Sequence, residues 1–186
     1  NQRGEIMGFA EKFIASLSSQ NLRDDAVHHD LDVIAAAALA GDMGALLCRV
    51  KYADGTVSRL FEGNAGNLAQ LLRAWTAAVA EKGRARRWVK AQTAWDAQAA
   101  TTLYRRVAEA SLAHWLDSKC KVCHGTGVVA AMHAGAPVAC KACRGAGEAA
   151  ISCSGGFELE RIKDMVSELE SIFQSHGARA MRRLGH

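Results

Sequence analysis

The chain has 186 residues, of which 49% are hydrophobic and 23% charged, with a net charge of +4. This composition is typical of one globular domain, or one domain with a small appended module, and excludes a disordered chain. A single proline and 17 glycines exclude a proline-rich linker or a collagen-like protein. No apolar run approaches the roughly 20 residues that span a bilayer. The first residues lack the pattern of a secretory signal, so we expect a soluble intracellular protein with no membrane partner.

The beginning of the chain is expected to be helical. Apolar residues at three- and four-residue steps over 6–17 predict an amphipathic helix. A second helix is expected after Asp30, an acceptable N-cap, through the alanine-rich stretch 34–40. Gly41 or Gly44 is expected to break it.

Residues 46–61 have a different pattern. Strand-favouring residues flank Asp54 and Gly55, a dipeptide that supplies positive φ in a tight turn, and so predict a short β-hairpin. A helix is then expected from Asn67 to Gly83.

The following segment begins with a dense basic run. Apolar residues after it predict one long helix, or two with Thr101 capping the second, that reaches Leu116. The residues of this apolar series are Trp88, Trp95, Leu103, Val107, Ala110 and His114.

Residues 118–153 are rich in glycine and cysteine and show no helical period. The period returns strongly over 157–173, which predicts an amphipathic helix ending at His176-Gly177. The residues after Gly177 are expected to form a short basic tail. The predicted fold class is therefore mainly α, with a possible hairpin at 46–61 and a cysteine module between two helices.

Two C-x-x-C pairs are the most specific signal in the chain. Cys120 and Cys123 form the first pair, and Cys140 and Cys143 form the second. Two such turns complete a tetrahedron of sulfur ligands, so we predict one structural Zn²⁺. Four protein ligands leave no open position, and no catalytic motif is present, so we expect no enzyme activity. The alternative is a pair of redox disulfides in a thiol-disulfide enzyme.

The remaining metal-binding side chains receive weaker assignments. Cys48 is expected to pack in the core, and Cys153 to be a thiol outside the metal site. His124 and His133 lie within the module and are the alternative ligands if one cysteine does not bind.

The sequence C-x-x-C-x-G-x-G occurs twice, at 120–127 and 140–147. This octapeptide resembles the repeat of the DnaJ-type chaperone zinc domain, although the chain lacks the J-domain signature. The pair of repeats more closely resembles the late-gene antitermination proteins of lambdoid phages, the lambda Q type. The first repeat reads Cys-x-x-Cys-His-Gly-Thr-Gly, as is typical of that family.

The resemblance to the lambda Q type implies a helical protein with a zinc module inserted between two helices of a helix-turn-helix-like unit. It implies a region 1–100 that includes polymerase contacts and a DNA-binding region 101–186 with its module at 118–153. It further implies a transcription antiterminator that binds double-stranded DNA at a late promoter. Its protein partner would be bacterial RNA polymerase with its sigma factor, in the cytoplasm of a bacterial host cell.

Charged residues in three places are the predicted DNA contacts. They lie in the run before the long helix, beside the cysteines and on the two helices that flank the module. These residues are Arg84, Arg86, Arg87, Lys90, Arg105, Arg106, Lys119, Lys121, Lys141, Arg144, Glu158, Arg161 and Lys163. The resemblance to the DnaJ zinc domain leaves an alternative function, a zinc-stabilised module that binds peptides or protein partners.

Overall fold

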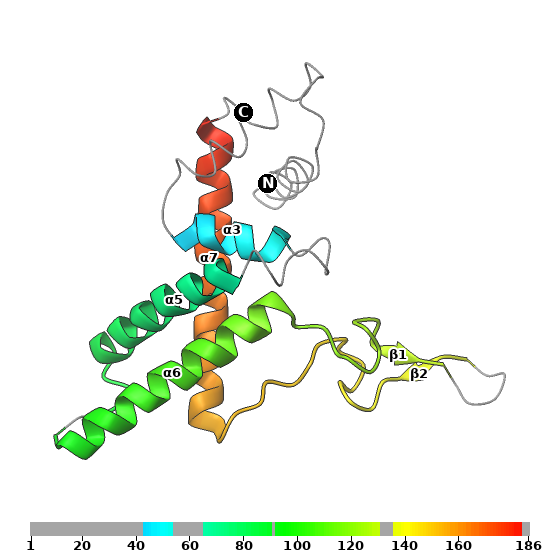
Figure 1. Cartoon of the computed structure of the whole chain (residues 1–186). Helices are drawn as coiled ribbons and strands as arrows, with labels where there is room; N and C mark the ends of the chain where they lie inside the picture. The colour runs from blue at the N-terminus through cyan, green and yellow to red at the C-terminus, as the bar shows by residue number, and fades with distance from the viewer. Residues whose placement is uncertain (1–42, 54–64, 91, 131–135, 184–186) are drawn as a thin grey trace. The chain divides into compact units, whose positions relative to one another are not determined.

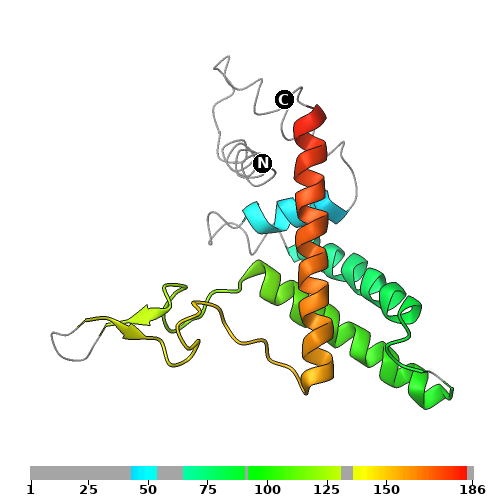
Figure 2. The same cartoon turned by 180° about the vertical axis from the view of Figure 1, so that it is seen from behind.

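The computed structural model describes residues 43–53, 65–90, 92–130 and 136–183. This part of the chain is mainly helical, with a small sheet and a cysteine cluster between helices (Figures 1 and 2), as predicted. The predicted helices at 6–17 and 34–40 lie outside the described residues. No described helix is long and apolar enough to cross a membrane. The elements are α3 (Met43–Ala53), α5 (Ala65–Ala85), α6 (Ala94–Leu116), β1 (Val128–Val129), β2 (Val138–Ala139) and α7 (Gly156–Arg183).

Contacts between residues divide the structure into two compact units. Among the described residues, unit one contains 43–53, 65–78 and 167–183, and unit two contains 79–166. Helices α5 and α7 each contribute residues to both units.

In unit one, residues 46–53 were predicted to form the first strand of a β-hairpin. They lie in helix α3, so this part of the prediction is wrong. Gly44, Leu47 and Cys48 are buried on one side of α3, at the three- and four-residue spacing of a helix. Tyr52 adds a ring contact to Phe173 of α7, with centroids 5.8 Å apart. Packing of this face decides the conformation, since β propensity depends strongly on context. The remainder of the predicted hairpin lies outside the described residues.

Helix α7 continues past the predicted stop at His176-Gly177 and ends at Arg183. The buried stripe of α7 includes Phe173, His176 and Ala180, so apolar contacts continue beyond the glycine. A Cβ on Gly44 would lie 2.4 Å from the Cβ of His176, so the missing side chain lets the two helices approach closely. Gly44 is therefore a packing position inside α3, and the end of the helix predicted through 34–40 lies outside the described residues.

In unit two, α6 is one continuous helix. Its N-cap Thr93 accepts a hydrogen bond from the Asp96 backbone N–H, and the Asp96 carboxylate accepts one from the Thr93 backbone N–H. The Asp96 carboxylate accepts hydrogen bonds from the backbone N–H of Gln92 and from the hydroxyl and N–H of Thr93. These bonds lower the pKa of Asp96. Thr101 lies inside α6, and its hydroxyl donates to the Ala97 carbonyl, so it caps no second helix.

Helix α5 ends two residues later than predicted, through a pair of backbone hydrogen bonds. The Trp88 N–H donates to the Gly83 carbonyl at 3.0 Å, and the Arg87 N–H donates to the Arg84 carbonyl at 3.1 Å. This is the Schellman pattern, in which the residue after the helix adopts a left-handed conformation. Arg87 occupies that position, with φ 51°. The buried Trp88 then packs edge-on against Tyr104 of α6, with centroids 6.0 Å apart.

The left-handed conformation of Arg87 predicts that glycine at this position gives a more stable fold than alanine does. Glycine adopts this conformation without the steric cost that a Cβ imposes, so Arg87→Gly should exceed Arg87→Ala in stability by about 0.5–1 kcal/mol. Urea unfolding of the two variants measures this difference, and both lack the guanidinium, so charge does not contribute. Equal stability of the two variants would contradict the left-handed assignment.

Candidate metal centre

Each C-x-x-C pair begins a turn that we call a knuckle, at 120–127 and 140–147. Gly127 and Gly147 both have φ of 75°, a left-handed value at which glycine is favoured. This conformation aims the Gly127 N–H at Sγ of Cys123, 3.3 Å away, and the Gly147 N–H at Sγ of Cys143, 3.2 Å away. The glycines of the repeat therefore supply hydrogen-bond donors to the sulfur atoms.

The two knuckles are joined by reciprocal backbone hydrogen bonds. The Cys120 N–H donates to the Gly147 carbonyl, and the Cys140 N–H donates to the Gly127 carbonyl, both at 2.8 Å. Beyond them β1 and β2 pair antiparallel, with Val129 opposite Val138. Because equivalent residues exchange equivalent bonds, the module has an approximate two-fold relation between its halves.

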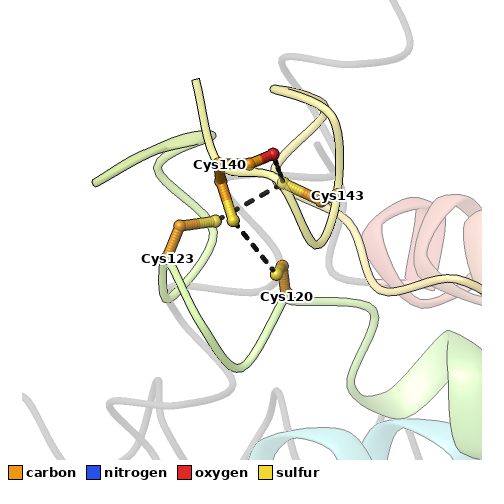
Figure 3. A group of neighbouring side chains, drawn as sticks. All are labelled: Cys120, Cys123, Cys140 and Cys143. Carbon is orange, nitrogen blue, oxygen red and sulfur yellow. Dashed lines mark hydrogen bonds between the residues drawn. The ribbon is translucent and has the colours of Figure 1, made fainter. Parts of the chain in front are cut away.

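This arrangement brings the four predicted cysteines to one point (Figure 3). Their sulfur atoms all lie within 4.8 Å of one another, and all four are free thiols. Sγ of Cys120 is 3.9 Å from Sγ of Cys140, and Sγ of Cys123 is 3.6 Å from Sγ of Cys143. A tetrahedral ion with bonds of about 2.3 Å to sulfur has sulfur–sulfur edges of about 3.8 Å. The cluster can therefore hold a metal ion.

The thiols differ in how readily they ionise. Burial opposes ionisation of Cys123, but the N–H groups of Gly127 and Gly125 donate to its sulfur and lower its pKa to about 6. Burial raises the pKa of Cys143 to about 11, against the opposing effect of the Gly147 N–H. A second thiolate beside the first is unfavourable until a cation binds. Metal binding is therefore expected to be linked to release of protons from the cluster.

The other candidate ligands lie outside the cluster. Among the described residues the four cysteines are the only group placed to hold a metal ion. Cys48 is buried in α3, where desolvation raises its pKa to about 12, so it is an unreactive core thiol. Cys153 and His124 are not members of the cluster, and His133 lies outside the described residues.

The cations predicted beside the cysteines are all exposed. Lys121 pairs with Asp117 at the end of α6, and Lys119 forms a backbone bridge with Glu148. Lys121 and Lys141 occupy equivalent positions in the two knuckles, as do His124 and Arg144. The module therefore presents cations on both of its halves. The exposed cations are Lys119, Lys121, Lys141 and Arg144.

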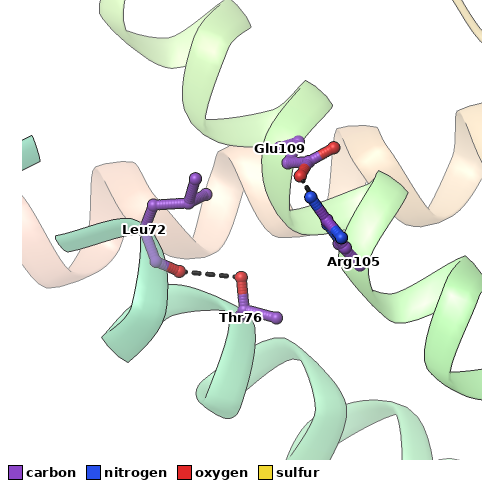
Figure 4. A network of polar contacts seen from close by, with 4 residues as sticks. All are labelled: Leu72, Thr76, Arg105 and Glu109. Carbon is purple, nitrogen blue, oxygen red and sulfur yellow. Dashed lines mark hydrogen bonds and ion pairs between the residues drawn. The ribbon is translucent and has the colours of Figure 1, made fainter. Parts of the chain in front are cut away.

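The predicted DNA contacts on α6 are exposed but form ion pairs. Arg105 Nε lies 2.8 Å from Glu109 on the same helix (Figure 4), in a pair whose side chains are both well exposed. Figure 4 also shows Thr76 of α5, in unit one, donating to the Leu72 carbonyl at 2.7 Å. An exposed ion pair such as that of Arg105 and Glu109 contributes little to the stability of the fold.

The predicted contacts in the first turns of α7 are held by intramolecular contacts. Glu158 is only 6% exposed, and its carboxylate lies 3.2 Å from Nε of Arg106. The Arg161 guanidinium stacks on Phe157 at 4.6 Å and on Trp88 at 5.8 Å from the ring centroids. A base contact by Glu158 or Arg161 would require these interactions to break. Lys163 is exposed.

The predicted contacts at the end of α5 are exposed as well. Arg86 pairs with Asp164 of α7. Arg84, Arg87 and Lys90 form no ion pair with any other residue that the structure describes. One exposed aromatic residue close to them in the sequence was not foreseen. Trp95 was predicted to join the apolar series of α6, but it is 86% exposed.

Comparison with known proteins identifies no relative: no family model, curated protein or solved structure matches this chain.

The ligand set predicts the effect of removing one sulfur. Cys140→Ser should abolish stoichiometric metal binding and lower the free energy of unfolding by several kcal/mol, because metal binding at such a site is folding free energy. Cys153→Ser is the matched control, since Cys153 lies in the same segment outside the cluster. Metal content by atomic absorption and thermal unfolding measure both effects. A Cys140→Ser protein with full metal content would overturn the ligand assignment.

The packing between knuckles predicts that two neighbouring glycines respond differently to alanine. Both have positive φ, but a Cβ on Gly127 would lie 2.4 Å from the backbone oxygen of Gly145, whereas one on Gly125 meets only the Lys119 side chain at 3.4 Å. Gly127→Ala should therefore weaken metal affinity about tenfold or more relative to Gly125→Ala. Competition with a chromophoric chelator measures this ratio, and equal affinities would refute the close approach.

Proposed function

We propose that this protein is a zinc-stabilised, DNA-binding transcription antiterminator. The observation that carries the proposal is the exposed set of cations on both halves of the cysteine module. A closed site of four thiolates suits a structural role, and it leaves the module's surface for binding. Phosphate groups are the ligands that such clustered cations attract most strongly.

Zinc is the metal that we infer for the cluster. Four thiolate ligands favour soft or borderline metals, and a tetrahedral set of sulfur atoms is typical of zinc or iron–sulfur sites. The sulfur–sulfur distances of 3.6 and 3.9 Å agree with a single ion that has bonds of about 2.3 Å. Four thiolates and one Zn²⁺ carry a formal charge of about −2, which the adjacent cations offset.

Two further features support an antiterminator over other DNA-binding proteins. The repeat C-x-x-C-x-G-x-G resembles that of the lambda Q type, and the module follows α6 and precedes α7, the order that this family implies. We accordingly propose that the protein binds duplex DNA at a promoter and associates with bacterial RNA polymerase and its sigma factor. Read-through of a terminator would be its activity.

Salt dependence tests the DNA contact. Each phosphate contact adds about 0.9 to the slope of log affinity against log salt, so Lys121→Ala with Lys141→Ala should lower the slope by about 2. Arg182→Ala with Arg183→Ala is the matched control, since it removes the same charge from the far end of α7. The measurement uses labelled duplexes that tile the DNA around the gene, with random competitor. An unchanged slope in the Lys121 and Lys141 double variant would remove the module from the DNA interface.

A second function is favoured by apolar residues on the module. Val122, Val128 and Val138 are 61%, 44% and 49% exposed, which is unusual for valine. A module that binds peptides or protein partners, as the DnaJ resemblance implies, would use such residues. Apolar binding should persist in the same assay between 50 and 200 mM salt, whereas DNA binding should fall steeply.

A further inference from the structure

The positive charge of the chain is concentrated around the α5–α6 turn. Residues 82–106 contain seven basic side chains and one acidic side chain, a net charge of +6, whereas the whole chain carries +4. All other residues together therefore carry a net charge of −2. The single acidic residue, Asp96, is occupied by the capping box of α6. Arg86, Arg105 and Arg106 pair with carboxylates, whereas Arg84, Arg87 and Lys90 form no ion pair with any residue that the structure describes and remain available to attract anions.

An exposed indole lies within this basic segment. Trp95 is 86% exposed, whereas the other three tryptophans, Trp75, Trp88 and Trp115, are no more than 8% exposed. Trp95 precedes Tyr104 by nine residues, or two and a half helical turns, so it lies on the opposite face of α6 from that buried residue. An exposed indole offers a ligand a flat aromatic surface on which it can stack.

The cations nearest in sequence are available for a ligand. Lys90 and Arg87 lie five and eight residues before Trp95 and, like Arg84, are exposed without an ion pair among the described residues.

We propose that the α5–α6 turn binds an unpaired DNA strand, with Trp95 stacking on a base and Arg84, Arg87 and Lys90 contacting phosphates. Stacking requires an unstacked base, which duplex DNA does not offer but a single strand does. This combination of an aromatic platform with clustered cations is the arrangement that binds single strands without sequence preference. The assignment of DNA over RNA rests on the proposed function.

The fluorescence of Trp95 provides a direct test. Because the other tryptophans are buried, acrylamide quenching of the metal-loaded full chain reports mainly Trp95. Saturating oligodeoxythymidylate should quench the indole by stacking and protect it from acrylamide. Trp95→Ala should weaken oligonucleotide binding between about 5-fold and 100-fold, and Trp95→Phe should retain most of it. Leu68→Ala, which removes another exposed apolar side chain, should have no effect.

The contribution of the cations is measured separately, through the salt dependence of single-strand binding. Arg87→Ala with Lys90→Ala should lower the salt slope of single-strand binding by about 1.4, since each phosphate contact on a single strand contributes about 0.7. Arg182→Ala with Arg183→Ala should leave it unchanged. No protection of Trp95 by the oligonucleotide, or protection by anionic lipid vesicles only, would overturn the proposal. Tighter binding of oligouridylate than of oligodeoxythymidylate would overturn the assignment of DNA.

The same variants separate this proposal from the proposed function. Loss of single-strand affinity in Trp95→Ala with duplex binding retained supports the stacking role. If the chain binds no duplex but the oligonucleotide still protects Trp95, the duplex-binding function fails and the single-strand site remains. If duplex binding is intact and Trp95 is never protected, only the single-strand site fails.

Discussion

Four cysteine sulfur atoms that lie within 4.8 Å of one another are the constraint on which the structure of the module depends. Negative charge on these sulfur atoms would be stabilised by a bound cation and by the backbone N–H groups of Gly127 and Gly147, which reach Cys123 and Cys143 because the chain turns through left-handed conformations. The same turns bring Gly127 against Gly145 so closely that no side chain fits. The glycine positions and the close approach of the two knuckles thus belong to the same arrangement that brings the four sulfur atoms together.

In unit two, arginine side chains connect the elements around α7. Arg161 lies between Trp88 and Phe157, Arg86 pairs with Asp164, and Arg106 pairs with the buried carboxylate of Glu158. A guanidinium suits these positions because it stacks on aromatic rings and hydrogen-bonds in a plane. Some basic side chains of this unit therefore link helices, whereas Arg84, Arg87 and Lys90 form no ion pair with another described residue.

The sequence was sufficient for features that depend on local spacing. The four sulfur ligands followed from two C-x-x-C pairs, and the mainly helical class followed from the three- and four-residue apolar period. Features that depend on distant residues did not follow. Helix α3 requires packing against Phe173 to override strand-favouring residues, and α7 passes Gly177 because buried contacts continue to Ala180. The exposure of Trp95 was equally hidden, since a helical period counts apolar residues without showing which face is covered.

The two halves of the module are approximately symmetric, but they differ in a few side chains. Both copies of the repeat keep the cysteines, the glycines and the lysine at the second position, and the halves are interchangeable in those respects. They differ at three pairs of equivalent, exposed positions. In the first repeat these are Val122, His124 and Thr126, and in the second they are Ala142, Arg144 and Ala146. A duplicated scaffold can diverge freely only where it is not committed to the metal. Exchanging these side chains between the two repeats would therefore exchange the surface chemistry of the two halves while leaving the cysteines and glycines of the framework in place.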